Sequence, residues 1–391
     1  MSQTLEEIAS QPRLWRRALE VDASPLPRDG ESLAVVGCGT SWFIAQAYTT
    51  AREREGKGPG DAFTATEFPW DRHYDRVICL SRSGTTTEVV DVLRRLAERG
   101  TPGLLVTAVG GGPASPFASA EVVLGFADEE SVVQTRFATS ALAYFRASLG
   151  HDIAAAAADA ELALDAELPQ RWVDADQIAF LGTGWTIGLA NEAGLKLREA
   201  SQSWTEAYPA MEYRHGPISI AQPGRLTWVF GPVPEGLGEE VAATGAELVS
   251  SQWDPMAHLV LAQRLAVVAG LGLLDGLFGG HQGGIGVHHE AYRADAGAWR
   301  MLGQPGNAQP GQVNVALFRS EIATQQCQQR ALAAAVGADE GDALTRVDDE
   351  RGVGKEGAPG AGQAEVVEAD QGRARSVSGR RKAGPMRPAS P

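Results

Sequence analysis

The chain has 391 residues and a formal net charge of −15, with 43% hydrophobic and 21% charged residues. This is the composition of ordinary globular domains, and the length suffices for two or three of them. The acidic balance argues against nucleic-acid binding, and no uninterrupted apolar stretch of about 18 residues predicts a membrane span.

The three cysteines, Cys38, Cys79 and Cys327, cannot form a disulfide framework, and no CxxC or His-rich spacing suggests zinc. The first residues lack both the basic region and the apolar run of a signal peptide. We therefore expect a cytoplasmic protein that needs neither a metal ion nor another cofactor and that has no nucleic-acid or membrane partner.

The first 150 residues alternate short apolar runs with helical stretches. We expect strands over Leu33–Val36, Ala62–Ala65, Val77–Leu80, Leu104–Thr107 and Val122–Leu124. We expect helices over Leu5–Leu19, from Ser41 to about Arg54, and over Glu88–Arg99 and Val132–Leu149. Strands that alternate with helices at this spacing predict a parallel α/β sheet, which binds ligands at the carboxyl ends of its strands.

An internal repeat indicates that this unit occurs twice. Ala34–Ser41 (AVVGCGTS) returns 145 residues later as Ala179–Thr186 (AFLGTGWT), and both segments are typical of a strand, a Gly-x-Gly turn and a helix. Asp152–Leu168, between the copies, is rich in Ala, Asp and Glu and indicates a helical connector. We therefore expect a first domain at 1–150 and a second at 151–268.

The turn after the third predicted strand is rich in hydroxyl groups. Five of them surround one glycine, at Ser81, Ser83, Thr85, Thr86 and Thr87. A single Ser or Thr would cap the helix that follows, so the run favours a phosphomonoester site. Arg82 either adds charge to that site or faces solvent. The turn at Gly37–Ser41 also suits an anion, but it lacks the third small residue and the acid of a dinucleotide fingerprint.

Charged residues recur on one face of a helix predicted over Asn191–Ala200. Glu192, Lys196 and Glu199 are spaced at i, i+4 and i+7. An exposed Glu–Lys pair that adds a few tenths of a kcal/mol to the helix is one interpretation. A group of acid–base residues is the other.

Four motifs, in this order, resemble those of the double sugar-isomerase (SIS) domain family: Gly37–Ser41 (GCGTS), Ser81–Thr86 (SRSGTT), Asn191–Ala200 (NEAGLKLREA) and Glu206–Pro217 (EAYPAMEYRHGP). The resemblance runs from about Ser2 to Val267. It is strongest to the isomerase half of glutamine:fructose-6-phosphate amidotransferases and to related phosphosugar deaminases and deglycases. It implies two tandem doubly wound (flavodoxin-like) parallel-sheet α/β domains.

The resemblance also implies roles for individual residues. Glu199 matches the base that moves a proton between C1 and C2 of the open-chain sugar, and His215 matches a ring-opening histidine that comes from the partner subunit of a homodimer. With Glu192 and Lys196, these are the candidate catalytic residues. The candidate substrate-binding residues are Gly39, Thr40, Ser41, Ser81, Arg82, Ser83 and Thr86. The implied ligand is a phosphorylated hexose or amino sugar, which the protein isomerises or deaminates. A non-catalytic sugar-phosphate sensor is the alternative.

The sequence departs from the family in two places. Full amidotransferases begin with a catalytic cysteine and a glutaminase domain, whereas this sequence opens with Met1-Ser2, so we expect deamination, deglycation or isomerisation rather than synthesis. The family's C-terminal lysine motif is also not found. Lys196 is the only lysine between Lys57 and Lys355, so a Schiff-base mechanism lacks its usual residue.

The composition changes after Val267. Residues 270–286 hold eight glycines in 17 positions, which we expect no stable helix to tolerate at about 1 kcal/mol each. Residues 331–391 contain no aromatic side chain. We expect 269–391 to be a low-complexity, disordered tail, either a genuine extension or the product of a frameshift near codon 268. A frameshift would leave the second domain without its closing segment.

Overall fold

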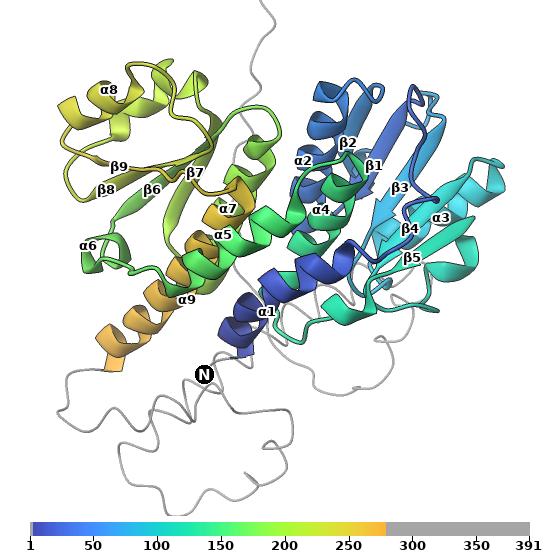
Figure 1. Ribbon diagram of the computed structural model, residues 1–391, viewed down its shortest axis with the longest axis horizontal. Coiled ribbons are helices and arrows are strands. Elements are labelled where there is room, and N and C mark those ends of the chain that lie inside the picture. The colour runs from blue at the N-terminus through green and yellow to red at the C-terminus, as the bar shows by residue number, and fades with distance from the viewer. Residues whose placement is uncertain (1–2, 279–391) are drawn as a thin grey trace, which may run out of the picture. The chain divides into compact units, whose positions relative to one another are not determined.

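The computed structural model describes residues 3–278, and the strands within them form two parallel sheets (Figure 1). The first sheet has the order β2-β1-β3-β4-β5. Its strands are β1 (Leu33–Gly37), β2 (Gly60–Thr64), β3 (Arg76–Leu80), β4 (Gly103–Thr107) and β5 (Ala120–Val123). All five strands predicted in this region are present, and every neighbouring pair is parallel.

The second sheet has the order β7-β6-β8-β9, again with every neighbouring pair parallel. Its strands are β6 (Gln177–Gly182), β7 (Trp204–Pro209), β8 (Arg225–Phe230) and β9 (Glu247–Val249). The α/β class with two tandem parallel-sheet units is therefore confirmed. The helices are α1 (Gln3–Ala18), α2 (Thr40–Arg54), α3 (Thr87–Glu98), α4 (Arg136–Ser148), α5 (Ile153–Asp165), α6 (Gln170–Val173), α7 (Thr186–Ser201), α8 (Leu237–Ala243) and α9 (Pro255–Phe278).

Both faces of the first sheet are buried, as the period of two in a strand predicts. In β1, Leu33 and Val35 face a large core that includes α2 and α4, whereas Ala34 and Val36 face a smaller core that includes α3. Helices on both faces make the sheet doubly wound. Because both faces are buried, the strand sequences are almost continuously apolar.

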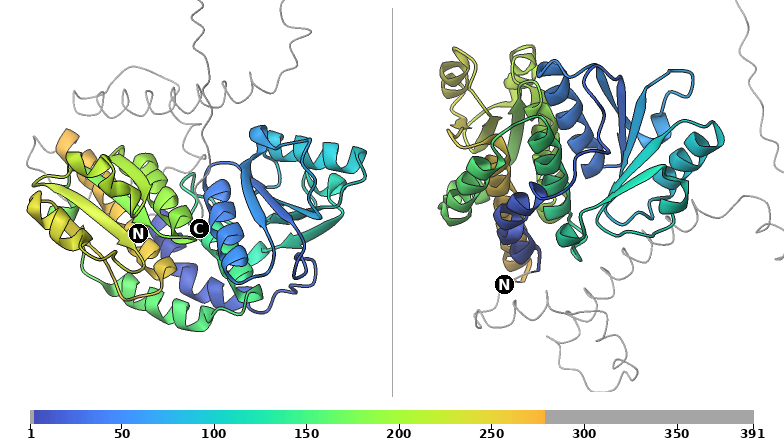
Figure 2. Two further views of the ribbon diagram at one scale, coloured as in Figure 1. Left: turned by 90° about the horizontal axis from the view of Figure 1, so that it is seen from above. Right: turned by 45° about the vertical axis from the view of Figure 1, so that its right-hand side comes forward.

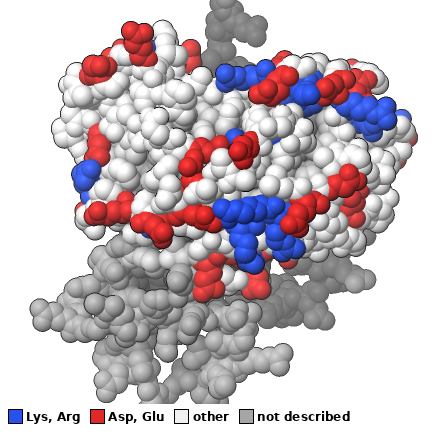
Figure 3. Space-filling model, in the orientation of Figure 1, with Lys and Arg blue, Asp and Glu red and all other residues white. Residues whose placement is uncertain are grey.

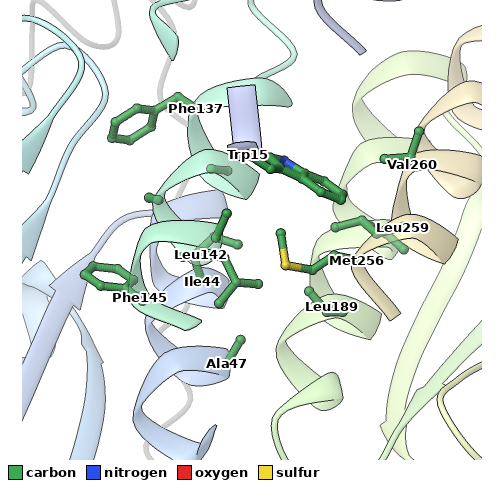
Figure 4. Packing of buried hydrophobic residues seen from close by; sticks show 14 of the residues in the cluster. Trp15, Ile44, Ala47, Phe137, Leu142, Phe145, Leu189, Met256, Leu259 and Val260 are labelled. Carbon is green, nitrogen blue, oxygen red and sulfur yellow. The ribbon is translucent and has the colours of Figure 1, made fainter. Parts of the chain in front are cut away.

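The large core is a layer of helices that lies between the two sheets (Figures 1 and 2). Figure 4 shows side chains from different helices meeting there. Among them are Trp15 of α1, Ile44 of α2, Leu142 of α4, Leu189 of α7 and Met256 of α9, each no more than 2% exposed. One continuous apolar core therefore joins the two sheet units.

Helices α2 and α7 cross at very short distance because α7 has a glycine at the contact. A Cβ atom on Gly188 would lie 2.4 Å from the Phe43 carbonyl oxygen and 2.8 Å from the Ala47 nitrogen. Beside this point the Asn191 amide donates to Gln46 Oε1 at 2.8 Å. The crossing brings the first turns of α2 next to the middle of α7.

Exposed charges contribute little to this arrangement. The face in Figure 3 carries acidic and basic side chains next to one another. Arg16 of α1, for example, pairs with Glu161 of α5 at 2.6 Å, and both side chains are about half exposed. Such pairs stabilise a fold by about 0–1 kcal/mol each, so the apolar layer is what holds the units together.

Helix α4 begins at Arg136, four residues later than the predicted Val132. The difference has a physical cause: the buried Glu129 carboxylate accepts hydrogen bonds from the backbone N–H groups of Thr135 (2.8 Å) and Arg136 (3.0 Å). These donors have no partner within the helix, and an acidic group at this end is stabilising. The carboxylate therefore fixes the start of the helix.

Helix α9 runs to Phe278. The expectation that the glycine-rich stretch from residue 270 cannot be helical is therefore wrong for residues 270–278. A Cβ on Gly270 would lie 2.3 Å from the Ala200 carbonyl oxygen, so this glycine permits close packing against α7. Tertiary packing here outweighs the intrinsic cost of glycine in a helix. The remainder of the proposed tail, 279–391, and both explanations of its origin lie outside the described residues.

A substitution at the crossing tests this role of glycine. We expect Gly188→Ala to lower the free energy of unfolding by roughly 1–3 kcal/mol, because the new methyl group meets backbone atoms that cannot rotate away. Denaturant unfolding measures the change.

Gly194→Ala is the matched control in the same helix. Its only tight Cβ contact would be the flexible Arg198 side chain, at 3.2 Å, because Thr205 and Phe180 lie at ordinary contact distances of 3.5 and 3.7 Å. We therefore expect it to be neutral or stabilising. Equal effects of the two substitutions would contradict the close crossing.

Candidate functional site

The loop Ser81–Thr87 follows β3 at the carboxyl edge of the first sheet, where a phosphate site was predicted. Ser81 Oγ lies 2.9 Å from Thr86 Oγ1, and Ser83 Oγ lies 2.7 Å from Thr85 Oγ1. Thr86, at the start of α3, makes no side-chain cap to the helix. The hydroxyls thus bond to one another rather than capping α3, and the helix N–H groups stay open to an anion.

Two glycines shape the turn between β1 and α2. A Cβ on Gly37 would lie 2.7 Å from Ser41 backbone and Cβ atoms, and Gly39 has a φ of 53°. Only glycine allows the close approach at the first position and adopts the second conformation readily. The turn buries Thr40 and Ser41, each 6% exposed, at the same sheet edge as the hydroxyl loop.

The charged face of α7 is buried, which rules out the exposed Glu–Lys pair. Glu192 is 0% and Lys196 1% exposed. The Lys196 ammonium donates to Glu199 Oε2 at 2.6 Å and lies 3.6 Å from Glu192 Oε1. The Glu199 side chain, by contrast, is 36% exposed. The three residues form one cluster in which only Glu199 is accessible to a ligand.

Burial governs the protonation of this cluster. It raises the pKa of Glu192 from 4.5 to about 7, although the Lys196 ammonium and the nearby Thr40 hydroxyl act in the opposite direction. Burial alone would lower the pKa of Lys196, but the Glu192 and Glu199 carboxylates outweigh it and raise that pKa. Lysine therefore stays charged, and Glu192 titrates near neutral pH.

Thr40 joins the second-unit cluster to the first unit. Its hydroxyl acts to lower the pKa of the Glu192 carboxyl group, and a Cβ on Gly39 would touch the Leu195 side chain at 4.0 Å. The close crossing of α2 and α7 creates these contacts. The structure thus brings the predicted residues of the Gly37–Ser41 turn and of α7 into one place.

Glu129 is a buried carboxylate that the sequence analysis missed. It is 1% exposed, and its charge raises the pKa of Lys196. Burial raises the pKa of Glu129 itself to about 7, against the backbone N–H donors of α4, which lower it. The signal was available, since the acids at 128–130 come directly before a predicted helix.

The Arg82 guanidinium bonds to the segment that precedes α4. It donates to the Glu129 carbonyl oxygen at 2.9 Å and lies 3.3 Å from Asp128 Oδ1. Arg82 therefore ties the loop to the segment that carries Glu129. Phosphate contact by Arg82 remains a prediction.

His215 makes no bond to the α7 cluster in the part of the chain that the structure describes. It is exposed and lies between the 3₁₀ helices η4 (Glu212–Arg214) and η5 (Pro217–Ile220) of the second unit. Within residues 3–278, no hydrogen bond or ion pair joins it to Glu192, Lys196 or Glu199. Its role as a ring-opening histidine that comes from a partner subunit stays a prediction.

Two general features complete the description. Within residues 3–278, no group of three or more His, Cys, Asp or Glu side chains is arranged to hold a metal ion. None of the helices in this part of the chain is both long and apolar enough to cross a membrane.

The sequence is similar to those of isomerizing glutamine–fructose-6-phosphate aminotransferases. It is 27% identical to the Pyrobaculum aerophilum enzyme over 238 residues, covering 55% of this chain and 39% of that protein. It is 26% identical to the Streptococcus pneumoniae R6 enzyme over 291 residues, covering 63% and 48%. The matched part of the chain thus spans about two fifths to one half of the length of these relatives. No protein-family model matches it.

Solved structures share the fold. The C-terminal domain of glucosamine-fructose-6-phosphate aminotransferase from Francisella tularensis has a TM-score of 0.59 at 20% identity, covering 69% of this chain and 95% of that one. Glucosamine-6-phosphate deaminase from Thermotoga maritima has a TM-score of 0.58 at 22% identity, covering 71% and 95%. Tagatose-6-phosphate ketose/aldose isomerase from Escherichia coli has a TM-score of 0.56 at 20% identity, covering 72% and 94%.

In fold and in sequence, the chain resembles proteins of the double sugar-isomerase type. Within that type, the sequence resembles the isomerase half of the glutamine–fructose-6-phosphate aminotransferases. The resemblance predicted from the four motifs is thereby confirmed.

The buried ion pair makes stability depend on pH. Because the folded-state pKa of Glu192 is above 4.5, the native protein binds more protons than the unfolded chain between pH 4.5 and about 7. This group's contribution to the free energy of unfolding is therefore lost as pH rises through that window. We expect Lys196→Met to extend the loss to higher pH and to destabilise the protein by about 3–5 kcal/mol at pH 8, but by less at pH 5.

Denaturant unfolding at pH 5, 6, 7 and 8 measures this dependence. Adding Glu192→Gln to Lys196→Met should restore much of the stability at pH 8. Arg94→Met, at an exposed arginine paired within α3, is the control and should cost less than about 1 kcal/mol at either pH. A loss from Lys196→Met that is the same at pH 5 and pH 8 would contradict the assignment.

Proposed function

We propose that this chain binds a phosphorylated hexose or amino sugar and transfers a proton between C1 and C2 of the open-chain form. One observation carries the proposal: an accessible carboxylate, Glu199, is held by a buried Glu192–Lys196 pair next to the turn at Thr40. The hydroxyl loop at Ser81–Thr87 follows a neighbouring strand at the same sheet edge. Similarity to aminotransferases that are named as isomerizing supports it.

The chemistry requires one base on one face of the C1–C2 bond. Glu199 removes the proton from one carbon, an enediol or enamine forms, and the resulting carboxylic acid returns the proton to the other carbon. Lys196 holds the Glu199 carboxylate through the 2.6 Å hydrogen bond, so the base keeps one orientation. The phosphate supplies binding energy remote from the reacting carbons.

For an amino sugar, the same proton transfer leads to deamination. A 2-amino-aldose becomes a 2-imino intermediate, and water then releases ammonia and leaves a 2-ketose phosphate. Water and ammonia balance the reaction, so no redox cofactor is required. This corresponds to a glucosamine 6-phosphate to fructose 6-phosphate conversion.

We propose that His215 opens the sugar ring from the partner subunit of a homodimer. Its exposed position, without a hydrogen bond to the α7 cluster in residues 3–278, supports a site completed by a second chain. A non-catalytic sugar-phosphate sensor remains the second candidate. A sensor requires hydroxyls for the phosphate, but it has no use for a buried ion pair that holds an accessible carboxylate.

Removing two loop hydroxyls tests the phosphate assignment. We expect the Ser81→Ala/Ser83→Ala protein to bind glucosamine 6-phosphate at least tenfold more weakly, since each contact to a charged group contributes about 1.5–3 kcal/mol. Isothermal titration calorimetry measures the affinity.

The control for this test is Ser115→Ala/Ser119→Ala, which removes two hydroxyls that bond within the same unit, to Glu121 and to the Gly103 carbonyl. The control should bind as the native protein does. Unchanged affinity in the loop variant would contradict the assignment of the phosphate site to Ser81–Thr87.

Replacement of the base distinguishes an enzyme from a sensor. We expect Glu199→Gln to leave binding unchanged and to lower turnover by ~10²–10⁴-fold, the scale of a lost general base. Ammonia and ketose phosphate released from glucosamine 6-phosphate are the readout. Glu161→Gln, an exposed carboxylate on α5, is the control. Binding with thermal stabilisation, but without turnover by the native protein, would instead establish a sensor.

Mixed subunits test the shared site. Glu199→Gln and His215→Ala proteins should each be inactive, and their mixture should recover part of the native activity. A mixture that forms mixed dimers without recovering activity would show that each site is built from one chain.

A further inference from the structure

A cavity of about 580 Å³ lies at the carboxyl edge of the second sheet, away from the proposed catalytic cluster. It opens beside the turn between β6 and α7 and the segment Gly231–Pro234 after β8. The end of α2, the loop before α5 and the start of α9 form the other walls. Its volume lies within the roughly 300–1,000 Å³ typical of sites for small molecules.

The cavity occupies the place where an α/β sheet of this topology binds ligands. Strand β6 lies between β7 and β8, so the strand that follows it in the chain pairs on one side and the next strand pairs on the other. Strand β1 lies likewise between β2 and β3 in the first sheet. Such switch points leave a crevice at the carboxyl ends of the strands. The repeat places the turn at Gly182–Thr186 where the first unit has Gly37–Ser41.

Arg54 provides an available positive charge in this cavity. A Cβ on Gly184, whose φ is 62°, would lie 2.4 Å from Arg54 Nη1, so the guanidinium lies directly over the Gly-x-Gly turn. Arg54 is exposed, and within residues 3–278 it has no ion pair or hydrogen bond. A cation is favourable in the last turn of any helix, and this explains an arginine at position 54. It does not explain why the guanidinium lies against Gly184.

Trp185 forms a rigid aromatic wall. One face of its indole is covered by the Arg146 guanidinium, 4.6 Å from the ring centroid. Arg146 is in turn fixed by two 2.8 Å hydrogen bonds to Asp254 and donates to His151 Nδ1 at 3.1 Å. His151 Nε2 lies 3.3 Å from Glu55 Oε1. Trp185, His151 and Glu55 all line the cavity.

The segment after β8 differs from the hydroxyl loop of the first unit. Gly231-Pro-Val-Pro234 has no hydroxyl group, and its two prolines have no N–H to donate. It therefore offers an apolar wall instead of a phosphate cradle. The cavity combines one arginine, one aromatic wall, an apolar wall and a carboxylate–imidazole pair that can bond to hydroxyls.

The geometry points to a second binding site here, for a monosaccharide that carries one anionic group. The sugar ring packs against Trp185, its hydroxyls bond to Glu55 and His151, and its phosphate or carboxylate pairs with Arg54. This site is separate from the proposed catalytic site and does not depend on the reaction proposed there.

Hydrogen–deuterium exchange of the full chain locates binding directly. The probes are glucose 6-phosphate and glucuronate, which carry the two possible anions, with glucose and inorganic phosphate as comparisons. We expect at least one anionic sugar to slow exchange at the amides of 183–187, and neither comparison compound to do so. Whichever anionic sugar acts identifies the preferred anion.

Substitutions connect the protection to Arg54. Arg54→Ala should weaken the binding of the anionic sugar that slows exchange at 183–187 roughly ten- to hundredfold, the range for a lost charge-assisted contact. Arg95→Ala removes the same charge from the last turn of α3 and should change nothing. Gly184→Ala should weaken the binding of the sugar as Arg54→Ala does. The control is Gly100→Ala, at a glycine with a similar positive φ (70°) in open space, and it should leave the binding unchanged.

Three results would overturn the site. They are no protection at 183–187 by either anionic sugar, equal protection by glucose or by inorganic phosphate, and equal weakening by Arg54→Ala and Arg95→Ala.

Discussion

Helices α2 and α7 join the two sheet units where they cross at very short distance. Gly188 has no side chain, so its helix can lie against the Phe43 carbonyl at a distance that a Cβ atom would forbid. The apolar layer between the two sheets forms around this contact. Because the crossing fixes the two Gly-x-Gly turns relative to each other, it also brings Glu192 of the second unit to Thr40 of the first.

Buried charge is the cost of the site that results. Two carboxylates and an ammonium group lie on one face of α7, and two of the three groups are almost fully buried. Such a cluster stabilises the fold only weakly, because the desolvation of the charges offsets most of their attraction. Its value lies in orientation: Lys196 is held from one side by Glu192 and holds Glu199 on the other. A carboxylate fixed in this way suits proton transfer to a bound sugar.

The two sheet edges share one architecture but differ in chemistry. Both have a strand, a Gly-x-Gly turn and a helix, and in both the first glycine permits close approach of the following helix. At the first edge the neighbouring loop is Ser81–Thr87, rich in hydroxyls. At the second it is Gly231–Pro234, rich in proline. The same backbone geometry therefore favours a phosphate cradle at one edge and an apolar wall with Arg54 at the other.

The α/β class, all five strands of the first sheet and the positions of the two turns could be predicted from the sequence, because apolar periodicity and glycine spacing are local properties. The sequence also predicted the face shared by Glu192, Lys196 and Glu199. The burial of Lys196, the influence of Glu129 on its pKa and the bonds of Arg82 to residues 128 and 129 became visible only in the folded chain. The same holds for α9, which continues through Gly270 because α7 packs against it. Burial and contacts between residues over 40 positions apart depend on how helices cross, and no local pattern encodes that crossing.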